Sequence, residues 1–124
     1  MNILFILNDA PYGTEKSYNA LRIAMALQKE HSKVMVRFFL MADAVSCALI
    51  NQQTPSGYYN IQRMLRSVIS KGSDVMTWGT CLNARGLRDL PVIEGVEVSN
   101  MAQLAEMIVQ ADKVLSFWND CETI

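Results

Sequence analysis

Short apolar runs recur along this 124-residue chain, and segments with helical periodicity separate them. The first run, at residues 3–7, is continuously apolar and bounded by polar residues, which is typical of a strand buried on both faces. Comparable runs lie at 34–40, 74–77 and 114–117, and the helical segments lie at 14–31, 43–50, 61–71 and 99–108. This alternation predicts βαβ units, and therefore an α/β fold with a parallel sheet and helices on both faces.

Local signals predict where the helices begin and end. Thr14, Asp43 and Ser99 are expected to cap the first, second and last helix, because a short polar side chain can accept a hydrogen bond from a helical N–H. Gly72 is expected to close the third helix in the left-handed conformation. Residues 88–97 contain proline and glycine and predict an irregular connection.

The composition argues against several functional classes. The formal net charge is -1 and no basic run stands out, so a nucleic-acid partner is not expected. The apolar stretch at 34–50 is interrupted by Arg37 and Asp43 and is shorter than the roughly 20 residues that span a membrane, so no membrane partner is expected.

The length suits a single domain over residues 1–124. Hydrophobic residues make up 51% of the chain, a slight surplus that a subunit interface would bury.

Cys47, Cys81 and Cys121 form no C-x-x-C pair, and their number is odd. This usage predicts free thiols in a reducing compartment, and the N-terminus lacks the basic region of a signal peptide, so a cytoplasmic location is expected. Cys47 lies among small apolar residues and is expected to pack in the core. Cys121 lies near the chain end and is expected to have no role, and the alternative is a mobile accessory thiol.

No metal or cofactor is predicted. His31 is the only histidine and has no cysteine nearby, so no metal-ligand spacing exists. The chain also lacks the G-x-G-x-x-G and G-K-[ST] motifs that cradle nucleotide phosphates.

Cys81 is the strongest candidate for chemistry. Ligands of parallel α/β sheets gather beyond the carboxyl ends of the strands, and the loops at 8–14 and 79–86 leave such ends. A thiol there can lie near the N–H groups that begin a helix, which favours the nucleophilic thiolate, and Arg85 one turn later adds a positive charge. Gly79 and Thr80 are expected to line the same site. The alternative is that Cys81 is a small buried hydrophobe, since free cysteine is often buried.

The loop after the first strand supplies further candidates. Asn8 and Tyr12 are expected to line a pocket around the thiol. They could equally be turn and cap residues, which is the usual role of polar side chains in such loops.

Three segments between Asn2 and Phe117 carry a resemblance to a known family: Asn8-Asp9-Ala10-Pro11-Tyr12-Gly13, Met41-Ala42-Asp43-Ala44-Val45-Ser46-Cys47-Ala48 and Gly79-Thr80-Cys81-Leu82-Asn83-Ala84-Arg85-Gly86. They resemble the DsrE/DsrF/YchN-like family. The resemblance implies a three-layer α/β/α domain with a parallel sheet of about five strands, and homo-oligomers, commonly trimers or hexamers. It also implies that Cys81 carries sulfane sulfur as a persulfide, received from a donor protein and passed to an acceptor protein.

One position departs from the pattern of some relatives. They carry a second cysteine three residues before the loop cysteine, where this chain has Trp78. Disulfide chemistry within the loop is therefore not expected, which leaves a single-thiol carrier resembling a sulfurtransferase. The alternative function is a non-catalytic oligomeric module that binds a small ligand or a protein and in which Cys81 only packs.

Overall fold

The computed structural model describes residues 1–55 and 59–118, and its centre is a five-stranded sheet in which every pairing is parallel. The strand order is β4-β3-β2-β1-β5. The predicted α/β fold with a parallel sheet is confirmed, and so is the number of strands that the family resemblance implied. The strands are β1 (Asn2–Leu7), β2 (Met35–Leu40), β3 (Asp74–Trp78), β4 (Val96–Ser99) and β5 (Lys113–Phe117).

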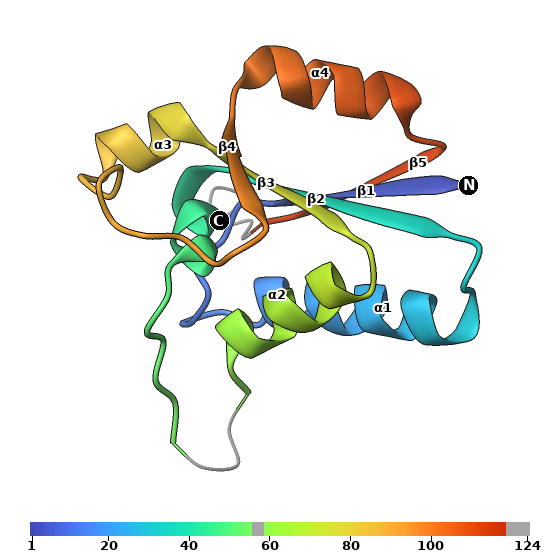
Figure 1. The fold of residues 1–124 in the computed structure, drawn as a ribbon, viewed down its shortest axis with the longest axis horizontal. Coiled ribbons are helices and arrows are strands. Elements are labelled where there is room, and N and C mark those ends of the chain that lie inside the picture. The colour runs from blue at the N-terminus through green and yellow to red at the C-terminus, as the bar shows by residue number, and fades with distance from the viewer. Residues whose placement is uncertain (56–58, 119–124) are drawn as a thin grey trace, which may run out of the picture.

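Helices cover both faces of this sheet (Figure 1). Helices α1 and α2 lie on one face, and α4 lies alone on the other. Helix α3 and the 3-10 helix η1 lie together at the end of the sheet where the strands finish. The helices are α1 (Lys16–Glu30), η1 (Ala42–Ala48), α2 (Ile61–Ser70), α3 (Gly79–Ala84) and α4 (Met101–Gln110).

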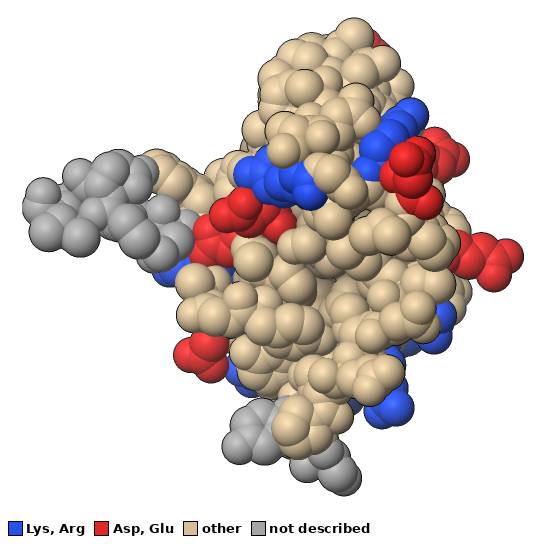
Figure 2. All heavy atoms as spheres, turned by 90° about the vertical axis from the view of Figure 1, so that its left-hand side faces the viewer, with Lys and Arg blue, Asp and Glu red and all other residues tan. Residues whose placement is uncertain are grey.

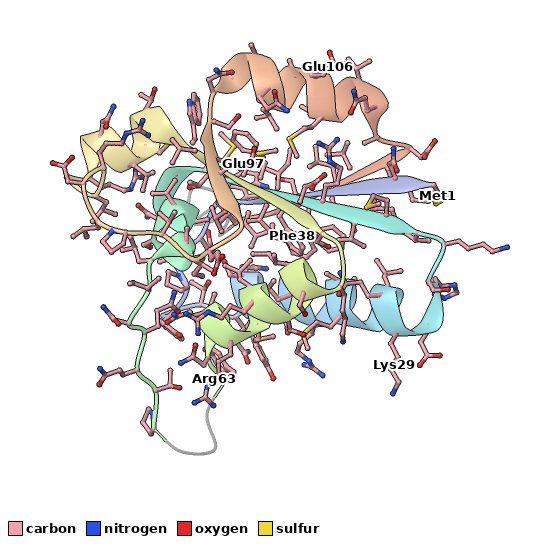
Figure 3. All side chains as sticks on the ribbon, viewed as in Figure 1. Met1, Lys29, Phe38, Arg63, Glu97 and Glu106 are labelled. Carbon is pink, nitrogen blue, oxygen red and sulfur yellow. The ribbon has the colours of Figure 1, made fainter. Side chains whose placement is uncertain are left out.

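Strand β1 pairs with β2 on one side and β5 on the other, which explains its continuously apolar sequence. Alternate side chains of a strand point to opposite faces, so Leu4 and Phe5 enter two different cores. Phe5 packs between the sheet and α1, where Phe38 also lies (Figure 3). The smaller core lies under α4 and consists of Leu4, Phe39, Met76, Leu104 and Met107.

The segment that was expected to be irregular contains a strand. Strand β4 begins at Val96 and pairs with β3, so the prediction for residues 88–97 is wrong at its end. Ser99 is the last residue of β4 and does not cap the final helix. Asn100 caps α4, and its side chain accepts a hydrogen bond from the N–H of Gln103.

The other predicted helix ends differ by one or two residues. Helix α1 begins after Glu15, although the Thr14 hydroxyl still accepts a hydrogen bond from the N–H of Lys16. Asp43 lies inside η1, which Met41 precedes. Gly72 follows α2 with a φ of +104°, the left-handed conformation predicted for it. Within the described residues, no helix is long and apolar enough to cross a bilayer.

Candidate functional site

The carboxyl ends of β1, β2 and β3 bring three chain segments to one edge of the sheet, because parallel strands finish on the same side. Ala42 begins η1 just after β2, and Gly79 begins α3 directly after β3. Cys81 is the third residue of α3, and its thiol is free and partly exposed. Figure 2 looks onto this end of the molecule, where residues other than Lys, Arg, Asp and Glu form most of the visible surface.

The Cys81 sulfur accepts a hydrogen bond from the backbone N–H of Ala42, with 3.3 Å between N and Sγ. Ala42 has a φ of +51°, a left-handed conformation that costs a residue with a Cβ roughly 1–2 kcal/mol. Asn51, the other non-glycine residue with positive φ in the described chain, is of a type that tolerates this conformation. Backbone strain of this kind tends to persist at functional sites, where the surroundings impose it.

Arg85 lies one helical turn after Cys81, as predicted, but its guanidinium group binds oxygen atoms rather than the sulfur. Its guanidinium forms an ion pair with Asp43, with 2.8 Å between Nη2 and Oδ1 and 3.0 Å between Nε and Oδ1. Its Nη1 also donates to the carbonyl oxygen of Cys81 at 3.2 Å. Arg85 therefore links η1 to α3 through main-chain and carboxylate oxygens, and its hydrogen bonds do not include the sulfur.

Gly79 and Thr80 occupy the first turn of α3, in front of Cys81. Gly79 is buried, and a Cβ there would lie 3.0 Å from Nη1 of Arg88 and 3.1 Å from Cγ1 of Val98. The absence of a side chain thus lets α3 pack closely against the end of β4. Thr80 directly precedes Cys81 in the sequence, and its side chain is exposed to solvent.

Asn8 ties the end of β1 to β5. Its backbone N–H donates to the carbonyl oxygen of Phe117 at 2.9 Å, and its side-chain amide donates to the same oxygen at 3.4 Å. Asn8 therefore acts as a turn residue at the same edge of the sheet as Cys81, and neither of these hydrogen bonds involves the thiol.

Tyr12 belongs to the loop after β1, and its side chain contacts the start of α2. Its hydroxyl donates to Oε1 of Gln52 at 2.8 Å and accepts a hydrogen bond from the N–H of Ile61 at 3.0 Å. Its ring stacks on Tyr59. Burial raises the pKa of the Tyr12 hydroxyl above its ordinary value. The hydroxyl accepts a hydrogen bond from an N–H in the first turn of a helix, and so acts as a cap. This matches the alternative in which Tyr12 is a turn or cap residue.

Cys47 is fully buried in the core, as expected. Burial raises the pKa of its thiol to about 12, although a hydrogen bond with the Ser17 hydroxyl at 3.8 Å opposes that shift. This thiol therefore stays protonated and unreactive at neutral pH. Cys121 lies outside the described residues.

Sequence reasoning did not identify Ala42 and Asp43 as neighbours of Cys81. The sequence predicts Asp43 only as a helix cap, because its pairing with Arg85 joins residues 42 positions apart. No side-chain signal could have revealed Ala42, because it acts through its backbone N–H. The described residues hold no group of three or more His, Cys, Asp or Glu side chains able to bind a metal ion.

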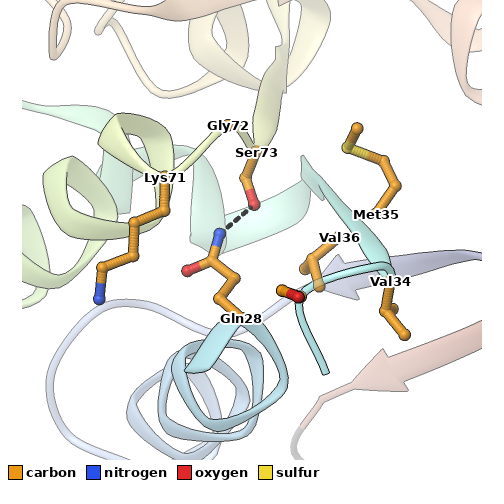
Figure 4. Close-up of a pocket in the computed structure, with 8 residues that line it drawn as sticks. Gln28, Val34, Met35, Val36, Lys71, Gly72 and Ser73 are labelled. Atoms are coloured by element: carbon orange, nitrogen blue, oxygen red, sulfur yellow. Dashed lines mark hydrogen bonds between the residues drawn. The ribbon is translucent and has the colours of Figure 1, made fainter. Parts of the chain in front are cut away.

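A cavity of about 210 Å³ lies at the opposite edge of the sheet, where β2 and β3 begin (Figure 4). The side-chain amide nitrogen of Gln28 crosses it to donate to the Ser73 hydroxyl at 2.9 Å. The Gln28 Oε1 atom is buried there without a hydrogen-bond partner among the described residues. This cavity is separate from the Cys81 site, since the two lie at opposite ends of the strands.

A five-stranded parallel sheet between helical layers, with a free thiol beyond its strand ends, defines a small three-layer α/β/α protein with a thiol site. The chain belongs to the DsrE/DsrF-like family, whose model matches residues 1–117. It is 43% identical to the protein YchN of Escherichia coli K12 over 115 residues, which cover 93% of this chain and 97% of YchN. It is 34% identical to MJ0989 of Methanocaldococcus jannaschii over 117 residues, which cover 94% of this chain and 100% of that protein.

Solved structures show the same fold. The crystal structure of YchN from E. coli superposes with a TM-score of 0.87 at 42% identity, covering 94% of this chain and 98% of that one. The structure of MTH1491 from Methanobacterium thermoautotrophicum superposes with a TM-score of 0.75 at 11% identity, covering 93% and 97%. The family expected from the sequence is confirmed.

Proposed function

We propose that this protein carries sulfane sulfur as a persulfide on Cys81. The observation that supports this most directly is a free, partly exposed thiol whose sulfur accepts a backbone N–H at the carboxyl edge of a parallel sheet. The thiolate is the nucleophilic form of cysteine, and a hydrogen bond to an ionised acceptor is stronger than one to a neutral acceptor. Membership of a family that includes sulfur-relay proteins adds support.

The proposed chemistry is two successive transfers of one sulfur atom. The Cys81 thiolate attacks the outer sulfur of a donor persulfide, a new S–S bond forms at Sγ, and the donor thiolate leaves with the electron pair. An acceptor thiolate then attacks the outer sulfur on Cys81, and the Cys81 thiolate leaves in the same way. The sulfur atom keeps its oxidation state throughout, so no external oxidant or reductant is needed.

Arg85 acts in this proposal as a positioning residue. Its guanidinium binds the Cys81 carbonyl oxygen and the Asp43 carboxylate, and so holds the first turn of α3 against η1. Because the carboxylate offsets its charge, Arg85 contributes little net positive potential at the sulfur. The single-thiol mechanism also agrees with Trp78 at the position where a second cysteine would make a dithiol.

Intact-mass analysis after incubation with glutathione persulfide tests the proposal. The wild-type chain should gain the mass of one sulfur atom, peptide mapping should assign it to Cys81, and Cys81→Ser should gain none. Cys121→Ser is the matched control, because it removes another thiol and should load normally. Loading that maps to Cys121, or a wild-type chain that never gains sulfur, would contradict the proposal.

We further propose that the protein works as a homo-oligomer, commonly a trimer or hexamer in this family, in the reducing cytoplasm. Edge strand β5 exposes Val114 and Leu115, which are 42% and 37% accessible, and Trp118 follows at 47%. Partner residues of parallel strands point to the same face, so Val114 lies on the face of Leu4, which α4 covers. A second copy of the chain would bury this apolar edge, and a net charge of only -1 gives weak repulsion between copies.

A further inference from the structure

The backbone of Met41, which precedes Ala42, is held at both its N–H and its carbonyl oxygen before any substrate arrives. The N–H of Met41 donates to the Leu7 carbonyl oxygen at 3.0 Å, which fastens it to the end of β1. The Met41 carbonyl oxygen accepts the N–H of Ala44 at 2.9 Å, which fastens it to η1. Between these two anchors, Ala42 adopts its left-handed conformation and its N–H meets the Cys81 sulfur. The donor is therefore preorganised, as groups that stabilise developing charge in active sites are.

From this geometry we propose that the Ala42 amide serves mainly the second transfer, in which Cys81 releases its sulfur to an acceptor. This inference rests on the proposed persulfide function. In the loaded protein, Sγ is the inner, uncharged sulfur of the persulfide. When the acceptor takes the outer sulfur, the S–S bond breaks and Sγ receives the electron pair as a thiolate. The Ala42 N–H lies where this negative charge appears, so it stabilises the departing thiolate.

The loading step benefits less from the same hydrogen bond. A donor that stabilises the Cys81 thiolate before it attacks makes that thiolate a weaker nucleophile. When Cys81 is the leaving group, the same stabilisation lowers the barrier to its departure. The Ala42 amide should therefore shift the protein toward giving up sulfur rather than retaining it.

Replacing one backbone N–H tests the idea directly. Lactic acid incorporated at position 42 converts the Met41–Ala42 amide into an ester. This removes the donor to Cys81 and also weakens the Met41 carbonyl oxygen as an acceptor for the N–H of Ala44. The matched control is the same ester at position 44, which disturbs the same bond between Ala44 and Met41 by removing its N–H but keeps the Ala42 N–H that reaches Cys81. Each protein is loaded with glutathione persulfide and then treated with cyanide. Cyanide takes the outer sulfur to give thiocyanate, and the Cys81 thiolate leaves.

We expect the ester at 42 to release thiocyanate about tenfold more slowly than the ester at 44, since hydrogen bonds to charged groups are the strong ones. Loading rates of the two esters should differ by less than this. Equal release rates in two folded, loaded esters would overturn the inference and leave the persulfide function intact. A wild-type chain that never loads would instead overturn the function on which the inference rests.

Nuclear magnetic resonance provides a second measurement, on the wild-type chain. The amide proton of Ala42 should move downfield as Cys81 ionises with rising pH, and it should move back when Cys81 is loaded with sulfur. The Ala44 amide serves as the internal reference, because its acceptor is a carbonyl oxygen that does not titrate. An Ala42 resonance that follows the Ala44 resonance through both changes would also overturn the inference.

Discussion

Asp43 shows how a single charge can govern the surroundings of the thiol. Its carboxylate offsets the Arg85 guanidinium, which also binds the Cys81 carbonyl oxygen. In Asp43→Asn the guanidinium charge is uncompensated, so alkylation of Cys81 by anionic iodoacetate should accelerate relative to neutral iodoacetamide. Two unit charges about 8 Å apart in water interact by roughly 0.5 kcal/mol, which corresponds to about a twofold change in the ratio of rates.

The control for this experiment is Asp74→Asn. It removes the same charge from the Arg37 ion pair at the opposite end of β3, far from the thiol. An equal change in both variants would mean that the effect comes from net charge rather than from the site. Both ion pairs are partly exposed, so neither variant should lose more than about 1 kcal/mol of stability.

Cys47 predicts a pH dependence of stability. The thiol ionises near its ordinary pKa of 9.0 in the unfolded chain, whereas burial holds the pKa of the folded thiol at about 12. The folded state therefore has its full advantage below pH 9 and loses it as the pH rises toward about 12. Between about pH 9 and pH 11, the unfolding free energy of the wild type should fall faster than that of Cys47→Ala. The difference should approach roughly 1.4 kcal/mol per pH unit.

Urea denaturation at a series of pH values measures this slope. Other groups that titrate in the same range affect both proteins alike, so only the difference between wild type and variant is informative. Parallel losses of stability in the two proteins would contradict the prediction.

At the scale of elements, the first turn of α2 depends on the loop after β1. In Tyr12→Phe the N–H of Ile61 loses its acceptor and Gln52 loses a donor. We expect a loss of about 1–2 kcal/mol in the free energy of unfolding, measured by urea denaturation, because a partly buried donor is left unpaired. Tyr18→Phe is the control, since the Tyr18 hydroxyl makes no hydrogen bond among the described residues.

The same variant bears on the pocket that Tyr12 was expected to line. Because its hydroxyl contacts α2, Tyr12→Phe should leave the alkylation rate of Cys81 unchanged. A slower reaction in a fully folded Tyr12→Phe protein would show that this side chain shapes the thiol site after all.

The elements also differ in how far the sequence predicts them. The strand at β1 is evident because burial on both faces requires a continuous apolar run. Strand β4 is only four residues long, lies at an edge, and exposes Glu97 and Val98, so its sequence lacks that run. What makes it a strand is its pairing with β3. The α4 cap moved from Ser99 to Asn100 for the same reason, since Ser99 is the residue that pairs with Trp78.

At the scale of the whole molecule, the exposed edge at β5 predicts association. Val114→Lys should shift the protein toward monomers in sedimentation velocity, because it places a charge on the apolar edge that a second copy would bury. Ile23→Lys on α1 is the matched control, since both side chains are 42% exposed. Dissociation by Ile23→Lys alone would locate the interface elsewhere, and a monomeric wild type would contradict assembly.

The class of fold, the family and Cys81 as the candidate residue could be predicted from residue types alone, because buried strands and a thiol loop leave signatures in side-chain type and order. The surroundings of that thiol could not be predicted in this way. The backbone N–H of Ala42, a residue in a strained conformation, donates to the Cys81 sulfur, and Arg85 pairs with Asp43, which lies 42 positions away in the sequence. Such contacts depend on where separate strands end in space, and the order of residue types along the chain does not reveal those positions.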